Sequence, residues 1–567
     1  MQKTLARILL AAVLATACKA RHEQSGTNLD LVAAEDTSTR ATETASDEGE
    51  TGGEISSLTG TVDISSGFDS KSLYDGLAEG KLGKKGGNGA FGSGRYGVLG
   101  VDQGMRGTRA ADPVTTEAYK QYEANGWAEA AKDHLSTFAA DVDTASYTIA
   151  RRKLAEGTLP PPAAVRVEEM VNYFKYAYPA PAAGSPFSVT SQLAPSPFDP
   201  SKRILRVGVS SKPLSIAERK PANLVFLVDV SGSMESPDKL PLAKRSLRIL
   251  VDNLKDGDTV ALVTYASGTQ VVLPPTGLEK KNEILAAIED LQAGGSTAMG
   301  DGISLAYAQA AKGLRPGAIS RVLVLTDGDA NIGKTSHEEI LATIAGKVKE
   351  GVTLSTIGFG MGNYKDELME QLADKGNGNN VYIDGPSQAR RVFQEQLGST
   401  LEVVAKDVKL QVDFDASQVK RYRLIGYENR NIADDDFRDD KVDAGEIGAG
   451  HQVTALYEIE LANTLGTTPL ATVRVRHKAP NGTKATEAAF PLQTSAMFSR
   501  FIDASDDFRF SFAVAGFGDV LRGGPDAKGW DLGSLRSIAN AAAASNTDRK
   551  EFVQLVDRAI ELRKKTS

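Results

Sequence analysis

Between Asn223 and Ser399, short apolar runs alternate with amphipathic stretches, and this alternation restricts the fold more than any other feature of the 567-residue chain. The apolar runs fit buried strands and are Leu224–Val228, Val260–Val263, Val322–Leu325 and Leu354–Phe359. The amphipathic stretches fit helices and are Lys239–Leu254, Met299–Ala311, His337–Lys349 and Tyr364–Ala373. This order predicts a doubly wound, mostly parallel α/β sheet with helices on both faces. Such sheets bind ligands beyond the carboxyl ends of their strands.

Three polar loops are expected at that edge of the sheet. They are Asp229-Val-Ser-Gly-Ser233, Gly294-Gly-Ser-Thr297 and Asp327-Gly-Asp329. Because the carboxyl ends of parallel strands meet at one edge, the side-chain oxygens of these loops can converge. The candidate metal-site residues are Asp229, Ser231, Ser233, Thr297 and Asp327. Hydroxyls and carboxylates without His or Cys favour a hard cation, Mg²⁺ or Mn²⁺.

These residues resemble the metal ion-dependent adhesion site (MIDAS) of von Willebrand factor type A domains, which combines D-x-S-x-S with a distant Thr and a distant Asp. The resemblance implies that the hydroxyls of Ser231, Ser233 and Thr297 contact the ion. Asp229 and Asp327 would then act through waters and hydrogen bonds. Neutral ligands leave the ion electrophilic, so an Asp or Glu of a partner protein is expected to complete its coordination. The expected function is metal-dependent protein binding, not catalysis.

Residues 1–18 have the pattern of an export signal. Two basic residues precede an apolar stretch from Ile8 to Ala15, which is too short for a membrane-spanning helix. Cys18, the only cysteine, follows directly after small residues, as in a lipobox, although Ala15 replaces the more usual leucine. We expect lipid attachment at Cys18, and plain secretion with cleavage near Ala17 is the alternative.

The chain beyond the signal resembles bacterial von Willebrand factor type A lipoproteins. The resemblance rests on the order of a tether, a segment from Asp141 to Tyr178, the α/β domain and the run Tyr422–Asn429. It implies a protein held in the cell envelope. Lys19 follows the cysteine where an aspartate would retain a lipoprotein at the inner membrane, so the outer membrane is preferred over the inner membrane or the cell surface.

The segment 19–115 is expected to be a disordered tether. It is rich in Ser, Thr, Glu and Gly and has no sustained apolar period, so it cannot bury enough surface to offset its chain entropy. Its run Gly92-Ser-Gly-Arg-Tyr-Gly97 matches the dinucleotide fingerprint, but no strand is expected before it and no helix after it.

The net charge of the whole chain is −8, which gives no basic excess for binding nucleic acid.

The segment 116–220 is expected to form a helical N-terminal domain associated with the α/β domain. Four apolar side chains at helical spacing predict one buried helix face, namely Val167, Val171, Phe174 and Tyr178. Asp141 and Asp143 are interpreted as helix N-cap residues in preference to metal ligands.

Two further parts follow the α/β domain, which is expected to span 221–400. Residues 401–494 alternate in polarity, as in Leu410–Phe414 and Val473–Arg476, which predicts an antiparallel β module. Residues 495–567 return to helical patterning and predict a C-terminal helical region.

Competing functions have weaker support in the sequence. The run Gly328–Thr335 matches the P-loop pattern, yet Asp327 and Asp329 would place negative charge beside a bound phosphate. The five histidines are scattered singly, which disfavours hydrolytic catalysis. An acidic run from Asp434 to Glu446 lacks EF-hand spacing and is interpreted as a solvated loop. A structural scaffold in which the metal site is idle remains an alternative.

Overall fold

The computed structural model describes residues 117–140, 142–215, 217–329, 336–463, 466–480 and 482–566. These residues all belong to one compact unit, Arg106–Ser567. The predicted signal peptide at 1–18, Cys18 and the predicted tether at 19–115 lie outside the described ranges, as does most of the P-loop match. Among the described residues, no helix combines the length and apolar character needed to cross a bilayer.

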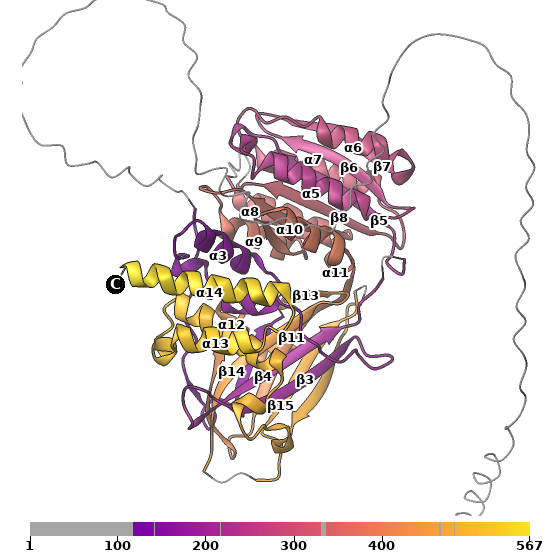
Figure 1. The fold of residues 1–567 in the computed structure, drawn as a ribbon. Coiled ribbons are helices and arrows are strands. Elements are labelled where there is room, and N and C mark those ends of the chain that lie inside the picture. The colour runs from indigo at the N-terminus through magenta and orange to yellow at the C-terminus, as the bar shows by residue number, and fades with distance from the viewer. Residues whose placement is uncertain are drawn as a thin grey trace, which may run out of the picture. The chain divides into compact units, whose positions relative to one another are not determined.

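An α/β domain occupies the middle of the chain and confirms the predicted doubly wound sheet (Figure 1). Its strands are β5 (Ala222–Asp229), β6 (Thr259–Tyr265), β7 (Thr269–Gly277), β8 (Ile319–Thr326), β9 (Val352–Phe359) and β10 (Asn380–Ile383). They lie in the order β10-β9-β8-β5-β6-β7, parallel except for the antiparallel edge strand β7. The first strand, β5, is central. The chain adds β6 and β7 on one side of it and β8, β9 and β10 on the other, and this change of direction creates the switch point at which ligands bind.

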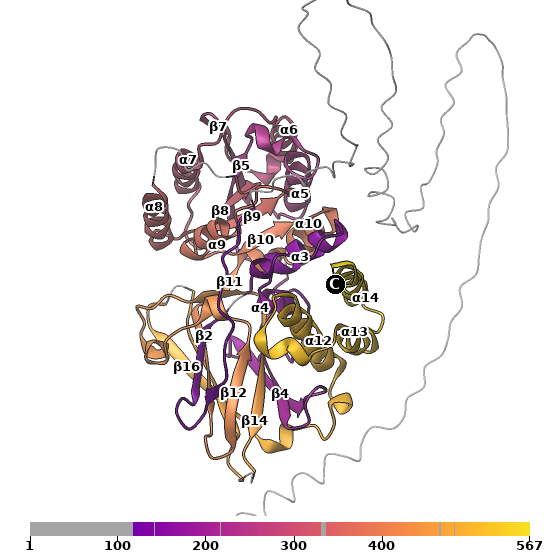
Figure 2. The same cartoon turned by 90° about the vertical axis from the view of Figure 1, so that its left-hand side faces the viewer.

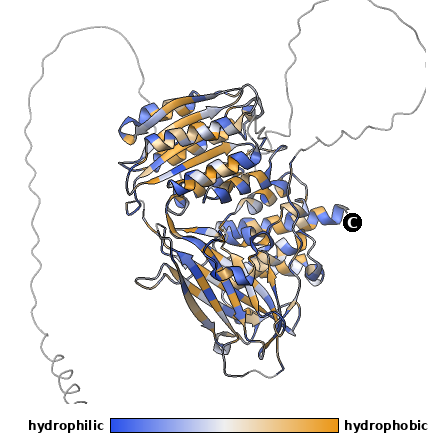
Figure 3. Cartoon of the chain, turned by 180° about the vertical axis from the view of Figure 1, so that it is seen from behind, coloured by the Kyte–Doolittle hydropathy of each residue, from blue (hydrophilic) through white to orange (hydrophobic). Residues whose placement is uncertain are grey.

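The helices of this domain are divided between the two faces of the sheet. They are α5 (Leu240–Asp252), α6 (Lys281–Glu289), α7 (Met299–Lys312), α8 (His337–Lys349), α9 (Asp366–Lys375), α10 (Pro386–Arg390) and α11 (Leu397–Leu401). Alternate residues of β5 point to opposite faces: Phe226 packs with α5 and α6, and Leu227 packs with α7 and α8. Figure 2 shows α7 and α8 on one side of the strands and α5 on the other, and in Figure 3 these strands are strongly hydrophobic.

The remaining strands form a sandwich of two antiparallel sheets. One has the order β1-β12-β14-β4-β3, and in the other β11 pairs with β2, β13 and β15, which continues to β16. Before the α/β domain lie β1 (Ala128–Glu129), β2 (Leu135–Ala139), β3 (Phe187–Pro195) and β4 (Lys202–Ser211). After it lie β11 (Val403–Phe414), β12 (Val419–Ile425), β13 (Gly445–Gly448), β14 (Gln452–Leu461), β15 (Ala471–Lys478) and β16 (Ala485–Leu492). Side chains from both sheets fill one core between them.

The segments 116–220 and 401–494 therefore both contribute strands to both sheets, although they were predicted to be separate parts. Nine residues of β14 pair with β4, from Gln452 opposite Ser210 to Glu460 opposite Lys202. The α/β domain is inserted between the two halves of this sandwich. The N-terminal segment also contains four strands where mainly helix was predicted.

Helices cover the outer face of the sheet that contains β4 and β14. They are α3 (Ala145–Ala155), α4 (Val167–Asn172), α12 (Asp506–Leu521), α13 (Leu532–Ala541) and α14 (Thr547–Thr566). They share a hydrophobic core with Ile204 of β4 and Leu456 of β14. The predicted stripe is buried as expected for Val167 and Val171, but α4 ends at Asn172, so Phe174 and Tyr178 reach this core from the chain beyond the helix.

Asp143 has a different role from the predicted helix cap. Its Oδ1 accepts a hydrogen bond from the backbone N–H of Asn380 at 3.0 Å, and its Oδ2 lies 3.1 Å from Arg430. The residue before α3 is Thr144, which makes no side-chain cap. Asp143 instead connects the α/β domain to the sandwich.

Candidate metal centre

The first loop of the candidate site leaves the carboxyl end of β5. Asp229, fully buried at the last position of the strand, accepts hydrogen bonds from Ser231 N at Oδ1 and from Thr326 Oγ1 at Oδ2, both at 2.9 Å. The hydroxyls of Ser231 and Ser233 lie 3.0 Å apart. This loop therefore presents two adjacent hydroxyls above a carboxylate of fixed orientation.

The second loop connects α6 to α7 and is attached to the first through the backbone. Gly294 N donates to Val230 O at 2.7 Å, and Gly232 N donates to Gly295 O at 3.0 Å. Gly295 has a φ of +86°, and a Cβ there would lie 2.6 Å from Ser267 Oγ, so only glycine fits. Thr297, two residues further on, is half-buried and lies just before α7.

The third loop follows β8 and places Asp327 beside a lysine. Asp327 is fully buried, and its Oδ1 accepts from Asp329 N at 3.0 Å. Its Oδ2 accepts from Lys239 Nζ at 2.9 Å and from Asn363 Nδ2 at 3.0 Å. Both oxygens of this carboxylate are thus engaged by the protein, as expected of a residue that supports the ion through hydrogen bonds.

Sequence reasoning missed Lys239, Thr326 and Asn363. Lys239 immediately precedes α5, and its ammonium reaches across to Asp327. Asn363 lies in the loop between β9 and α9, at the carboxyl end of the strand beside β8. The rule that ligands bind at this edge could have drawn attention to that fourth loop, but nothing in the sequence pairs Asn363 with Asp327.

The pKa values of the two buried carboxyls, Asp229 and Asp327, are shifted in opposite directions. Burial, with a contribution from nearby Asp327, raises the pKa of Asp229 above its ordinary value. Burial also opposes the charge of Asp327, but hydrogen bonds from Asn363, Lys239 and Ser233 outweigh it and lower its pKa. Hydrogen bonds thus stabilise the charge of Asp327, whereas burial disfavours the charge of Asp229, which a neighbouring cation would stabilise.

This set of donors fits a hard divalent cation. It consists of hydroxyl and carboxylate oxygens, with neither His nor Cys, and Mg²⁺ and Mn²⁺ prefer such oxygen ligands together with water. Ser231 and Ser233 would hold the ion directly, with Thr297 from the second loop. When bound, the ion would supply a positively charged centre that attracts an anionic oxygen atom.

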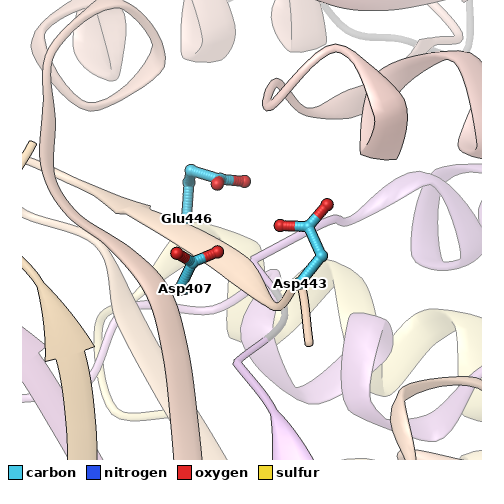
Figure 4. Close-up of side chains that lie close together, drawn as sticks. All are labelled: Asp407, Asp443 and Glu446. Atoms are coloured by element: carbon cyan, nitrogen blue, oxygen red, sulfur yellow. The ribbon is translucent and has the colours of Figure 1, made fainter. Parts of the chain in front are cut away.

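A second group of carboxyls lies away from these loops, where β11 pairs with β13 in the sandwich. Oxygen atoms of Asp407, Asp443 and Glu446 all lie within 4.8 Å of one another (Figure 4). Lys478 Nζ is 2.7 Å from Asp407 Oδ2. Loss of hydration at its carboxyl, together with the neighbouring Asp407, raises the pKa of Asp443 to about 6, although the residue as a whole is exposed. Lys478 and the raised pKa of Asp443 both reduce the negative charge of this cluster.

Comparisons with known proteins agree with the fold. Residues 223–396 match the family model described as von Willebrand factor type A (VWA) domain, residues 113–206 match one described as von Willebrand factor, and residues 399–562 match one described as uncharacterized protein YfbK, C-terminal. Uncharacterized protein YfbK of Escherichia coli strain K12 is 40% identical over 481 residues, which cover 80% of this chain and 82% of that protein.

Solved structures are more distant in sequence. A von Willebrand factor type A structure from Catenulispora acidiphila is 18% identical, with a TM-score of 0.39 over 68% of this chain and 89% of that chain. Proximal thread matrix protein 1 of the mussel byssus, solved with a zinc-occupied MIDAS motif, is 24% identical, with a TM-score of 0.27 over 31% of this chain and 45% of that chain. By its 40% identity to YfbK over most of both chains, this chain belongs to the YfbK family of proteins with a von Willebrand factor type A domain.

Proposed function

We propose that this protein is anchored by lipid in the cell envelope and captures a partner protein through a divalent cation in its VWA domain. In this proposal Ser231, Ser233 and Thr297 hold Mg²⁺ or Mn²⁺, while Asp229 and Asp327 support it through hydrogen bonds and waters. An Asp or Glu side chain of the partner completes the coordination. The protein acts as a binding module and not as an enzyme.

The observation that carries this proposal is the charge balance of the site. Two buried carboxylates, Asp229 and Asp327, face one buried ammonium, that of Lys239. A divalent cation added to this set leaves one positive charge in excess. A carboxylate from outside neutralises that charge at a sheet edge where ligands are expected, whereas a neutral ligand does not.

Crosslinking in cells tests whether the metal site captures a partner. Proteins crosslinked to the native chain and to Asp229→Ala are identified and compared, with Asp435→Ala as a control at a distant exposed carboxylate. We expect Asp229→Ala, but not the control, to lose the partner. Equal capture by Asp229→Ala, or capture by the purified chain in EDTA, would reject the metal mechanism and favour a scaffold that binds through its sandwich or its C-terminal helices.

Thermal unfolding of the purified chain tests metal binding itself. A ligand that binds only the folded state at 100 times its dissociation constant stabilises that state by about 2.7 kcal/mol. The unfolding midpoint should therefore rise when EDTA is replaced by excess Mg²⁺ or Mn²⁺, and Thr297→Ala should reduce the rise. ATP should act only by chelating metal. A rise caused by ATP and abolished by Lys334→Ala would instead support a nucleotide site.

Membrane fractionation tests the anchor. The native chain should carry lipid mass at Cys18 and sediment with membranes, because more than one acyl chain retains a protein stably. Separating the two membranes should place it in the outer one. Cys18→Ser should release it into the soluble fraction. A native chain without lipid, or a variant that still sediments with membranes, would reject the anchor.

A further inference from the structure

A fourth loop, Gly360–Lys365, reaches the metal site from the carboxyl end of β9. Its Asn363 donates to Asp327 Oδ2 and accepts from Lys239 Nζ at 3.2 Å. Gly360 also lies against the stem of Lys239, where a Cβ would come within 2.2 Å of that side chain. The position of this loop therefore determines how Asp327 and Lys239 are held.

Residues that precede the VWA domain hold the other side of this loop. Glu117 Oε1 accepts from Gly362 N at 3.0 Å, and Arg152 of α3 donates to Gly360 O at 3.0 Å. Ala118 N donates to Tyr364 O at 3.1 Å. These three contacts are made to alternate residues of the loop and fix its backbone from outside the domain.

The two side chains in this contact are buried and form an ion pair. Glu117 Oε1 lies 2.7 Å from Arg152, and Glu117 Oε2 lies 2.8 Å from Lys153. The side chain of Glu117 is 3% exposed and that of Arg152 is 7% exposed. A buried carboxylate that pairs with two cations has only one arrangement in which all of its hydrogen bonds are made. It therefore fixes the loop more rigidly than an ion pair on the surface would.

The loop needs such support because of its own sequence. Gly360 and Gly362 have φ values of +71° and +93°, and glycine loses more conformational entropy on ordering than any other residue. A loop with two such glycines has little intrinsic preference for the conformation that points Asn363 at Asp327. External contacts supply that preference.

We propose that Glu117 and Arg152 are positioning residues of the metal site, acting through the loop Gly360–Lys365 on Asn363, Lys239 and Asp327. The metal site is then shared between the VWA domain and the segment in front of it. This inference rests on the proposed binding of metal at this site. It predicts that a change at Glu117 weakens metal binding although Glu117 does not contact the ion.

The experiment measures Mg²⁺ and Mn²⁺ affinity of the full chain by titration calorimetry, and amide hydrogen exchange of the loop in EDTA. Groups that orient metal ligands change affinity by about 10- to 100-fold when removed, so Glu117→Ala should weaken binding by about tenfold. Exchange of the loop amides should accelerate without metal. Glu129→Ala, which breaks only the exposed pair with Lys132, is the matched control and should change neither quantity.

A double-mutant cycle identifies the route of the effect. Asn363→Ala alone should weaken binding, and adding Glu117→Ala should weaken it little further, because both changes act on the same contact. If Glu117→Ala is too unstable to assay, Glu117→Gln keeps an acceptor for Gly362 and loses only the charge, and it should show a smaller loss in the same direction.

Two results overturn the inference. One is a native-like affinity in Glu117→Ala, and the other is full additivity with Asn363→Ala. Either would leave the proposed function intact, because the native chain would still bind metal. A native chain that binds no metal would reject both the inference and the metal mechanism, and that result is visible in the first titration.

Discussion

Lys239 sets the charge of the metal site at the scale of single residues. A metal site normally gains affinity from negative charge, yet here a buried ammonium lies 2.9 Å from one of its two carboxylates. The lysine lowers the attraction of the site for a cation and raises the attraction of the bound cation for an anion. In the proposed mechanism, Lys239 therefore weakens the binding of metal and strengthens the binding of a partner carboxylate.

Lys239→Met tests this opposition, because methionine keeps most of the stem and removes the charge. Loss of a neighbouring like charge should tighten Mg²⁺ binding by about tenfold, on the order of 1.4 kcal/mol. Capture of a partner carboxylate at saturating metal should weaken. Titration calorimetry gives the first quantity and pull-down of the crosslinked partner gives the second. Lys244→Met, within α5, is the control, and a parallel change in both affinities would contradict this opposition.

Asp443 makes a separate contribution at the same scale, through pH. Its pKa rises from an ordinary 3.8 to about 6 because its carboxyl loses hydration and lies near Asp407. In the pH range between these two values the folded chain binds a proton that the unfolded chain has released, so stability falls as pH rises through it. Asp443→Asn should remove this loss.

Urea unfolding at pH 5 and pH 7.5 measures the effect of Asp443→Asn. The variant should gain stability relative to the native chain at pH 7.5 and gain less at pH 5. Asp435→Asn, at an exposed position of the same acidic run, serves as the comparison. An equal gain at both pH values would mean that the carboxyl is not titrating between them.

At the scale of elements, the central strands of the VWA sheet were predictable and its edges were not. β5, β6, β8 and β9 are continuous apolar runs because both of their faces are covered. β7 contains two adjacent prolines, which argue against a strand except at an edge, and β10 has only four residues. Such elements are defined by their neighbours more than by their own sequence.

The sandwich was only half predictable for a related reason. β14 alternates in polarity and was recognised as part of a β module, but its partner β4 lies about 250 residues earlier, across the whole VWA domain. Local periodicity carries no information on such pairing. The same limit applies to the metal site. The loops after β5 and β8 were predicted correctly, whereas the loop 294–297 joins α6 to α7 and does not follow a strand as expected, and Lys239 and Asn363 were not predicted.

Gly208 shows how one element makes room for another. It lies in β4, where a Cβ would come within 2.2 Å of the ring of Tyr178, which crosses the strand and hydrogen-bonds Thr454 at 2.9 Å. Gly208→Ala should displace this ring and destabilise the fold by about 1–3 kcal/mol, the usual cost of overpacking. Urea unfolding measures the loss. Gly126→Ala, where a Cβ meets nothing within 4 Å, should cost far less. Equal costs would show that Tyr178 can move aside freely.

At the scale of the whole molecule, buried ion pairs join the VWA domain to the part of the chain that surrounds it. Arg166, immediately before α4, lies 2.6 Å from Asp366 and 3.5 Å from Glu370, both on α9. Arg430, beyond β12, lies 3.3 Å from the buried Glu370 and, in a more exposed pair, 2.8 Å from Asp374. Thus α9 is held by residues on both sides of the insertion, directly after the loop that reaches the metal site. The inserted domain is a fixed part of this compact unit.

Arg166→Met tests how much this junction contributes to stability. The substitution leaves Asp366 and Glu370 buried with part of their positive charge removed, and breaking a buried pair in this way typically costs about 3–5 kcal/mol. Differential scanning calorimetry should show a lower unfolding midpoint. If the contacts at the junction break before the domains unfold, the VWA domain and the sandwich should unfold in two separate transitions. Adding Asp366→Asn should recover part of the loss, because the unpaired charge is then removed. Arg438→Ala, which breaks an exposed pair with Glu487, should cost no more than about 1 kcal/mol. If Arg166→Met costs as little as Arg438→Ala, the buried pairs do not hold the domain in place, and the apolar contacts around α9 must do so instead.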